Sequence, residues 1–365
     1  MTIVSSTVAK RLCQIEDRLK HGEWSITYPI LIAVLAAVLG MLSAASAKKI
    51  AYASSFAVLP VLYVVFLAVR ISQRGFALDH WLPNWDALPI IVTLIILERL
   101  YANKRAISQR ALLIRDMSSA FVNLFVAGAA TGFVVLPILL SITQYYFGRK
   151  IIFASPGQLG PIWAQIASIM LLVSLFRYWM HRFQHSNAFL WKFHSYHHRV
   201  TDLQASNILV SHPIDFILRN VLIFLVLSVI GFDPLALLIA IPAVQIYGFF
   251  SHCGGDVKGG WLNYVFATPE VHRWHHSAAT PAGHKYSVNY GVEFSFWDLL
   301  FGTYYLPGEQ GQTVSPERMG LGSGLADESS YLRLLLEPLG MYAIVPWLKR
   351  TIQIPGSPEC KQPTE

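Results

Sequence analysis

Long stretches without a charged side chain alternate with short polar segments along most of this chain. The four clearest stretches cover residues 26–47, 51–69, 118–148 and 162–176. An α-helix rises 1.5 Å per residue and the hydrocarbon core of a membrane is about 30 Å thick, so runs of this kind are typical of membrane helices. The third run contains Pro137, where a helix can kink. The pattern predicts four membrane-spanning helices.

Three further apolar stretches are shorter or more polar. Residues 88–97 are too few to span a membrane, so an interfacial or re-entrant helix is expected there. Residues 220–232 and 235–251 are separated only by Asp-Pro, a strong turn signal, and predict a helical hairpin that enters and leaves on one side. Residues 332–348 carry two charges and are expected to lie on the membrane surface or to pack on the protein.

Composition strengthens the membrane interpretation. Only 13% of the 365 residues are charged and 54% are hydrophobic, whereas an average soluble domain carries roughly 25% charged residues. Disorder, a collagen-like repeat and a disulfide-stapled module are excluded by this composition. The net charge of +7 comes from basic residues near the ends of apolar runs, where they anchor membrane helices. No nucleic-acid partner is therefore expected.

The histidines are strongly clustered. Eleven of the thirteen lie between His181 and His284, where an even spread predicts about four. They form H-x-x-x-H at 181–185 and H-x-x-H-H at both 194–198 and 272–276, whereas chance predicts about 0.02 matches to H-x-x-H-H. On a helix such spacings place the rings on one face. The candidate metal ligands are His181, His185, His194, His197, His198, His272, His275 and His276.

This set of ligands predicts the kind of metal. Neutral imidazole suits zinc, copper, iron or nickel, and eight imidazoles exceed the demand of one ion, so two ions are expected. The chain lacks H-E-x-x-H, which disfavours a zinc peptidase. A histidine-rich metal transporter or sensor is an alternative. Transport would favour ionisable residues inside the spanning helices, and the four runs lack them.

The order of these motifs resembles the fatty acid hydroxylase/sterol desaturase superfamily of membrane-bound, histidine-rich di-iron oxygenases. The three histidine motifs occur in that family's order, with a membrane hairpin between the second and third. Three further segments add to the resemblance, which covers residues 90–306: H-P-I-D at 212–215, N-Y-G at 289–291 and F-W-D-L-L-F-G-T at 296–303.

The resemblance implies a reaction and further ligands. Two iron ions would use O2 to hydroxylate a lipid C–H bond, with no separate acid or base assigned. The implied ligands are the eight motif histidines together with His252, and His212 is implied as a further metal ligand or a residue that supports one. His284 is expected to be a surface or supporting residue. After His252 many relatives continue His-x-Asn, whereas this chain has Cys-Gly. Four polar residues could orient ligand rings: Asp202, Asp215, Asn289 and Asp298.

Within the superfamily, alternatives remain open. The reaction could be desaturation, or monooxygenation of an ether lipid, a sterol or a carotenoid, and an inactive scaffold is a further possibility. The chain contains no H-P-G-G haem motif, no iron–sulfur cysteine spacing and no G-x-G-x-x-G loop. A separate electron donor is therefore expected, either a reductase, a ferredoxin or a cytochrome. A basic surface formed by Arg182, Lys192, Arg199 and Arg273 could dock an acidic carrier.

Together these patterns predict an all-α integral membrane protein with four transmembrane helices, a helical hairpin and a cytoplasmic histidine-rich helical cap. The excess of Lys and Arg at the N-terminus and in the loop 99–117 places both in the cytoplasm. The bacterial inner membrane or the endoplasmic reticulum would suit this topology. Three regions are expected: a two-helix anchor (1–86), a catalytic domain (87–310) and a C-terminal interfacial helix with a polar tail (311–365).

Overall fold

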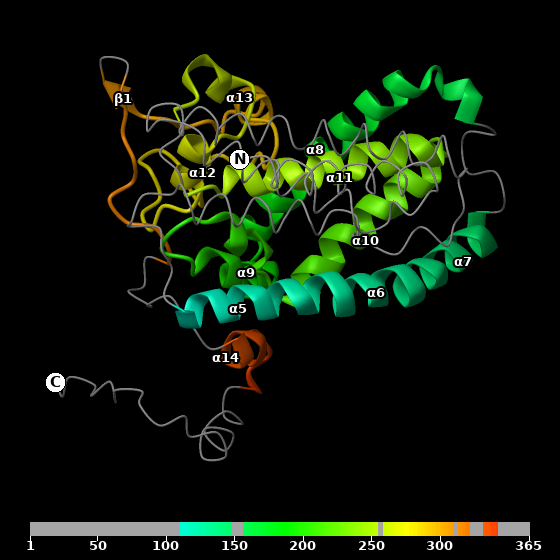
Figure 1. Cartoon of the computed structure of the whole chain (residues 1–365), viewed down its shortest axis with the longest axis horizontal. Helices are drawn as coiled ribbons and strands as arrows, with labels where there is room; N and C mark the ends of the chain where they lie inside the picture. Colours follow the sequence, from blue (N-terminus) through cyan, green and yellow to red (C-terminus); the bar gives the residue numbers. More distant parts are fainter. Residues whose placement is uncertain (1–109, 148–155, 255–257, 310–311, 322–330, 342–365) are drawn as a thin grey trace, which may run out of the picture.

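A computed structural model describes residues 110–147, 156–254, 258–309, 312–321 and 331–341 (Figure 1). The predicted helices at 26–47 and 51–69, the segment 88–97 and the predicted anchor region therefore lie outside the described residues. The described part is mostly helical, as predicted. Its strands form one small antiparallel hairpin, β1 (Gly308–Glu309) and β2 (Gln312–Thr313).

One long helical rod crosses the lower half of the view in Figure 1. Two helices with π geometry interrupt its α-helical turns, and its five segments in order are α5 (Arg110–Phe121), η3 (Val122–Ala127), α6 (Gly128–Ala130), η4 (Thr131–Val135) and α7 (Leu136–Phe147). Pro137 lies just after η4, and its ring would crowd the carbonyl of Phe133 in a regular α-helix. The wider π turn of η4, just before this proline, gives its ring more room.

The second long helix, α8 (Ile162–Ser186), has 25 residues and crosses from the apolar part of the chain into the histidine motifs. It extends ten residues beyond the predicted run at 162–176. Asn187 then begins α9 (Ala188–His198) by accepting hydrogen bonds from the backbone N–H groups of Phe189 and Leu190. Two described helices are long and apolar enough to cross a membrane: Ile114–Leu139 and Ile162–Ser186.

The predicted hairpin is present as α10 (Pro213–Ile230) and α11 (Pro234–Ser251). The first helix begins seven residues earlier than predicted, because His212 accepts a hydrogen bond from the Ile214 N–H and Pro213 occupies the first turn. Gly231, with φ of 79°, ends that helix, and the Asp233 side chain caps the next by accepting from the Leu235 N–H at 2.8 Å.

The cap at Asp233 allows a direct test of the hairpin. Asp233→Ala removes the acceptor at the start of α11 and is expected to destabilise the protein by about 1 kcal/mol. Asp233→Asn keeps an acceptor at the same place and should retain most of that stability. Thermal unfolding in detergent compares the two variants. Equal unfolding temperatures for both would contradict a capping role.

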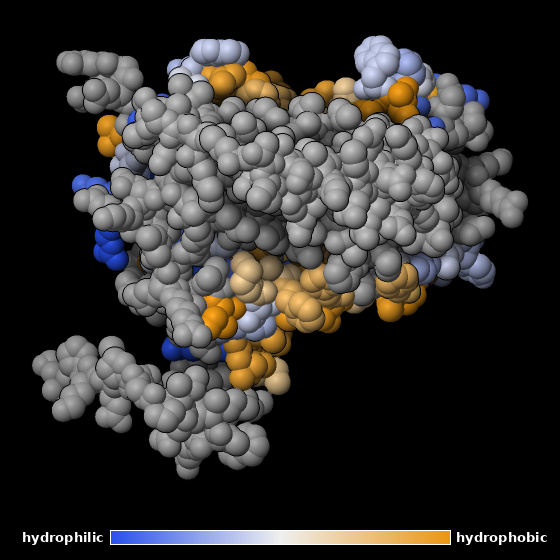
Figure 2. Space-filling model, in the orientation of Figure 1, coloured by the Kyte–Doolittle hydropathy of each residue, from blue (hydrophilic) through white to orange (hydrophobic). Residues whose placement is uncertain are grey.

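Three helices share one apolar core. Ile169 and Val173 of α8 pack with Ile223 and Leu227 of α10, and α11 contributes small or branched side chains to the same cluster: Ala236, Ala240 and Val244. Outward-facing side chains are also large and apolar, such as Phe133 at 71% and Trp163 at 70% exposure. Figure 2 shows apolar side chains along the long rod at the lower edge. Apolar surface on both sides of the helices is typical of a protein surrounded by lipid.

Several short elements complete the described fold. They are η5 (Pro156–Leu159), η6 (Ala205–Leu209), η7 (Gly260–Tyr264), α12 (Pro269–His275), α13 (Phe296–Leu300), α14 (Tyr331–Leu336) and η8 (Glu337–Leu339). In Figure 1, α12 and α13 lie at the upper left and α14 lies below α5. The described part of the run at 332–348 packs on the protein, because Leu334 is buried with Tyr196 and Val200, and Glu337 pairs with Arg199 at 2.8 Å.

Candidate metal centre

Nine of the ten predicted ligands converge in two neighbouring sets of buried ring nitrogens. Within each set the candidate ligand atoms lie within 4.8 Å of one another. We call them the first and second histidine groups. The first group contains His181, His185, His194, His198 and His275. The second group contains His197, His252, His272 and His276.

Each H-x-x-H-H motif contributes to both groups. In the motif on α9, His194 and His198 belong to the first group and His197 to the second. Successive helical residues point about 100° apart, so His197 and His198 face different directions. Their ring planes are 89° apart. The motif on α12 divides in the same way, with 84° between His275 and His276. The two motifs therefore hold the groups side by side.

Four ring nitrogens bond to oxygens behind the groups. His181 and His275 donate from Nδ1 to the carbonyls of Tyr290 and Val288, each at 2.8 Å. In the second group, His197 donates from Nδ1 to the Val210 carbonyl at 3.0 Å. A carbonyl accepts only, so Nδ1 carries the hydrogen in these rings and the Nε2 lone pair is free to bind a metal.

His252 follows the same arrangement with a side-chain partner. Its Nδ1 lies 3.0 Å from Oδ1 of Asn207, which also accepts from the backbone N–H of Gln204. The amide nitrogen of Asn207 donates in turn to the Asp202 carbonyl at 2.7 Å. This network fixes the direction of the His252 ring. Asn207 has no motif of its own in the sequence and was not predicted.

The residues present fit metal ions. Within the described residues, five group members have a buried ring nitrogen without a hydrogen-bond partner: His181, His185, His194, His272 and His276. Leaving such atoms unpaired costs free energy, which a bound ion would offset. Nε2 atoms of different elements also approach closely, at 3.0 Å for His252 and His272 and 3.1 Å for His198 and His275. Two nitrogens bound to one ion at about 2.1 Å and roughly 90° lie about 3 Å apart.

Burial also sets the charge of these rings. Removal from water lowers the pKa of His197, His198, His272 and His276 well below the usual value for histidine, and neighbouring imidazoles lower it further. Burial lowers the pKa of His275 to about 3. These five imidazoles are therefore neutral at physiological pH, as a metal ligand must be.

The structure does not bring His212 into either group. Its Nδ1 accepts from the Ile214 N–H at 3.1 Å, and its Nε2 donates to the Leu335 carbonyl at 3.0 Å. Both ring nitrogens are thus used by the start of α10 and by α14. The expectation that His212 is a metal ligand is corrected to a helix-capping role. His284 lies partly exposed near Tyr305 and is also outside both groups.

The loop behind the first group depends on Asp298 and Gly291. The Asp298 carboxylate accepts from the backbone N–H groups of Tyr290 and Gly291 at 2.7 and 2.8 Å, so it holds the carbonyl that binds His181. Asn289, with φ of 55°, bonds to the carbonyls of Val271 and Tyr305. Both side chains therefore support the loop, and neither contacts an imidazole directly.

Asp215 is nearer to a ring. Its Oδ2 lies 3.5 Å from Nδ1 of His194 and 3.2 Å from Nη2 of Arg219, and its Oδ1 accepts from the amide of Gln184. Among the four polar residues suggested to orient imidazoles, Asp215 is the one within reach of a ring. For Asp202, the backbone carbonyl accepts a hydrogen bond from the side-chain amide of Asn207.

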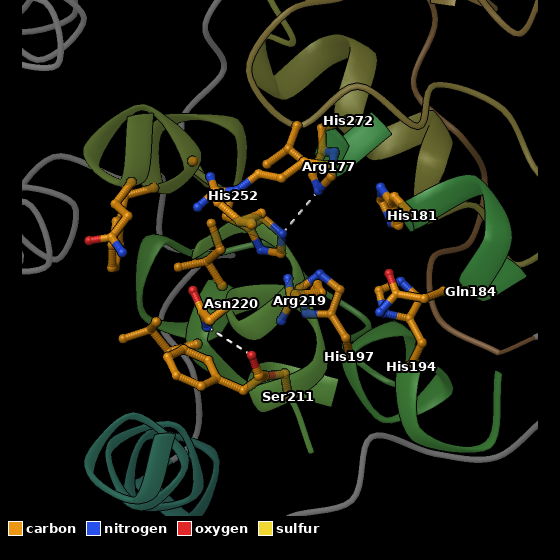
Figure 3. A pocket seen from close by; sticks show the side chains of 18 of the residues that line it. Arg177, His181, Gln184, His194, His197, Ser211, Arg219, Asn220, His252 and His272 are labelled. Atoms are coloured by element: carbon orange, nitrogen blue, oxygen red, sulfur yellow. Dashed lines mark hydrogen bonds between the residues drawn. The ribbon is translucent and has the colours of Figure 1, made fainter. Parts of the chain in front are cut away.

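A pocket opens beside both groups and is bordered by α8, α10 and α11 (Figure 3). Each helix lends one face, because the lining positions recur three or four residues apart: 177, 181 and 184 on α8, 216, 219, 220 and 223 on α10, and 245, 248 and 249 on α11, with His252 directly after its end. His181, His194, His197, His252 and His272 form part of its wall. A molecule in this pocket would therefore contact the candidate metal ligands directly.

The fatty acid hydroxylase family model matches residues 166–303. This stretch contains all nine clustered histidines and the N-Y-G loop. Residues 166–303 are thus similar to the fatty acid hydroxylase family, in agreement with the resemblance that the order of the histidine motifs indicates.

The curated relatives act on lipids according to their names. The chain is 34% identical over 148 residues to ornithine lipid hydroxylase OlsE of Rhizobium tropici, which covers 40% of this chain and 44% of that protein. It is 32% identical over 146 residues to sphinganine C4-monooxygenase 1 of Arabidopsis thaliana, covering 38% and 54%. A Delta(7)-sterol 5(6)-desaturase, ERG3B of Gibberella zeae, is 23% identical over 184 residues, covering 48% and 55%.

The chain spans about half the length of these relatives. No solved structure matches it.

Asn207 offers a test of the second group that leaves every histidine intact. Asn207→Ala removes the acceptor for His252 Nδ1 and is expected to weaken metal binding about 10- to 100-fold. Metal affinity is measured by titration of the metal-stripped protein. Asn123→Ala is a suitable control, because Asn123 is a buried asparagine that bonds to the Leu209 and Ser211 carbonyls and not to a histidine. Equal metal affinities for the two variants would contradict the role of Asn207.

Proposed function

We propose that this chain is an integral-membrane di-iron oxygenase that hydroxylates a C–H bond of a lipid. The observation that supports it is the pair of adjacent, all-histidine groups at one end of helices long and apolar enough to span a membrane. Iron is one of the four metals that suit a set of imidazole ligands. The pocket beside the groups gives a lipid access to them.

Iron bound at the two groups would supply the reduction of O2 and the oxidant for an unactivated C–H bond. In the overall reaction, one oxygen atom enters the lipid as an alcohol. The other leaves as water with two protons and two electrons from the donor. The chain's own residues keep the imidazoles neutral, fix their direction and exclude water from their nitrogens. The pocket wall holds one carbon of the lipid close to the groups.

Hydroxylation is favoured over desaturation by the names of two relatives, a hydroxylase of ornithine lipid and a monooxygenase of sphinganine. Sterol desaturases are also among the relatives, so the product of the reaction decides between them. An alcohol gains one oxygen atom, whereas an alkene loses two hydrogens.

The proposal includes a membrane topology and an electron donor. The two described spans are joined by two more at 26–47 and 51–69, and the active site faces the cytoplasm, since basic loops flank the spans on that side. Regions 1–86, 87–310 and 311–365 act as anchor, catalytic domain and interfacial tail. A separate reductase, ferredoxin or cytochrome supplies the electrons.

The test combines metal analysis with lipid analysis. The full chain is purified in detergent and its iron is counted, with two ions per chain expected from the two groups. Lipids of cells producing the wild type are then compared by mass spectrometry with those of cells producing His275→Ala. A hydroxylated lipid should be present only with the wild type. Iron well below two per chain together with unchanged lipids would refute the proposal.

Gly248 allows the pocket to be blocked without touching a ligand. It is buried on the pocket face of α11, and a Cβ there would lie 3.0 Å from Cδ1 of Ile208. Gly248→Leu is expected to fill the pocket and reduce hydroxylation at least about tenfold while iron content is retained. Gly132→Leu is the control, since a Cβ there meets nothing within 4 Å. Full activity in Gly248→Leu would show that the lipid binds elsewhere.

A further inference from the structure

The pocket beside the histidine groups contains polar side chains that a channel for a plain hydrocarbon chain does not need. Its apolar wall comes from residues such as Leu124, Ile208, Phe216, Ile223 and Phe249. Among them stand amides and guanidinium groups from all three bordering helices: Arg177, Gln184, Arg219, Asn220 and Gln245. Figure 3 shows Gln184 beside His194 at this wall.

One carboxylate organises two of these polar groups. Asp215 accepts from the Gln184 amide with Oδ1 and pairs with Arg219 through Oδ2 at 3.2 Å. Since both groups are held by the same carboxylate, they lie close together, and both line the pocket. The Asp215 carboxylate itself is buried.

Two atoms of this arrangement remain unsatisfied. Gln184 is only 2% exposed, and its amide nitrogen is committed to Asp215, so its Oε1 is an acceptor without a partner. Nε of Arg219 is a buried donor that also lacks a partner. A buried acceptor and a buried donor each cost free energy unless an occupant of the pocket pairs with them. The occupant should therefore both donate and accept a hydrogen bond.

The charges favour a neutral occupant. Arg219 is paired with Asp215, and Arg177 is paired with the buried Glu293. Neither guanidinium therefore offers the unbalanced positive charge that would recognise a phosphate or a free carboxylate. A secondary amide meets the requirement, because its N–H can donate to Gln184 Oε1 and its C=O can accept from Arg219 Nε.

We propose that this pocket binds the amide group of an N-acyl lipid through Gln184 and Arg219. This inference rests on the proposed function. His181 lies three residues before Gln184 on α8, so its ring is within one helical turn of that contact, about 5 Å along the axis. The carbon that faces the metal site therefore lies near the polar end of the lipid, and a carbon in the middle of the acyl chain would be too far from the amide contact.

The inference is tested by binding, with two probes that differ only in the group concerned. N-ethylpalmitamide carries an N–H where ethyl palmitate carries an oxygen. Dissociation constants are measured by calorimetry on the iron-loaded full chain in nanodiscs without reductant. The amide is expected to bind at least about tenfold more tightly, as one hydrogen bond to a buried acceptor allows. Equal affinities, or tighter binding of the ester, would overturn the inference.

Two variants test whether Gln184 causes the preference for the amide probe. Gln184→Met keeps the length of the side chain without the acceptor and should abolish the preference for the amide. Gln245→Met removes an amide elsewhere in the same pocket and should change both affinities by the same factor. A preference that survives in Gln184→Met would overturn the assignment to Gln184. Iron content and unfolding temperature report whether each variant is intact, and the comparison of probes on the wild type stands without them.

The binding result is separate from the proposed oxygenase function. Equal probe affinities in a protein that binds iron and hydroxylates a cellular lipid would refute only the amide contact. A protein without iron and without a lipid product would refute the oxygenase function whichever probe it prefers.

Discussion

Replacing His275 with alanine is expected to remove about one metal ion per chain and to lower hydroxylation at least about 100-fold, since loss of a ligand should exceed the effect of losing a ligand's supporting partner. His275 belongs to the first group, and its Nε2 lies 3.1 Å from Nε2 of His198. The variant leaves the His198 nitrogen without this neighbour and the Val288 carbonyl without its donor. Metal content is measured by mass spectrometry and the hydroxylated lipid by chromatography.

Two further histidine variants make this result specific. His272→Ala, on the same helix but in the second group, should also lose about one ion, and the double variant should lose both. His212→Asn is the matched control, because Asn can still cap α10 and His212 lies outside both groups. Full metal content in His275→Ala, or loss of metal in His212→Asn, would contradict the division into two groups.

Replacing Gly291 with alanine is expected to destabilise the protein by about 1–3 kcal/mol and to weaken metal binding in the first group. A Cβ at this position would lie 2.7 Å from Oδ2 of Asp298 and closer still to the Phe294 carbonyl oxygen. The backbone must move to relieve this overlap. Tyr290 is the preceding residue, so its carbonyl would shift away from Nδ1 of His181. Thermal unfolding and metal titration measure the two effects.

Gly132→Ala provides the comparison for that experiment. It introduces the same methyl group where no heavy atom lies within 4 Å, so neither stability nor metal binding should change appreciably. If Gly291→Ala behaved like Gly132→Ala, the loop would tolerate the extra atom. The Tyr290 carbonyl would then not depend on a glycine at position 291.

The helices of the described region follow closely from local sequence. The structure has helices over the uncharged run at 162–176 and over the described part of the run at 118–148. A turn separates α10 from α11 at the Asp-Pro pair, as the sequence predicts. These features depend on interactions between residues a few positions apart. The residues at which helices begin were harder to predict. Helix α10 begins at Pro213 because His212 accepts a hydrogen bond from the Ile214 N–H, whereas the resemblance implied that His212 binds a metal.

His212 shows why a motif can mislead. Its imidazole is chemically able to bind a metal, and the neighbouring H-P-I-D pattern suggested that it does. The second nitrogen, however, bonds to the carbonyl of Leu335, a residue 123 positions away. No local pattern reveals such a contact.

The sequence by itself determined which residues are able to bind metal and that they lie on helical faces, because spacings of three and four residues are set by the α-helix alone. Only the tertiary structure decided how they are shared. Neighbours such as His197 and His198 turn to different groups, and the ring that meets His198 comes from His275, 77 positions away. The tertiary structure also decided that the carbonyl oxygens of Val288 and Tyr290 accept hydrogen bonds from His275 and His181. Every residue carries a backbone carbonyl, so its role depends on where the chain places it.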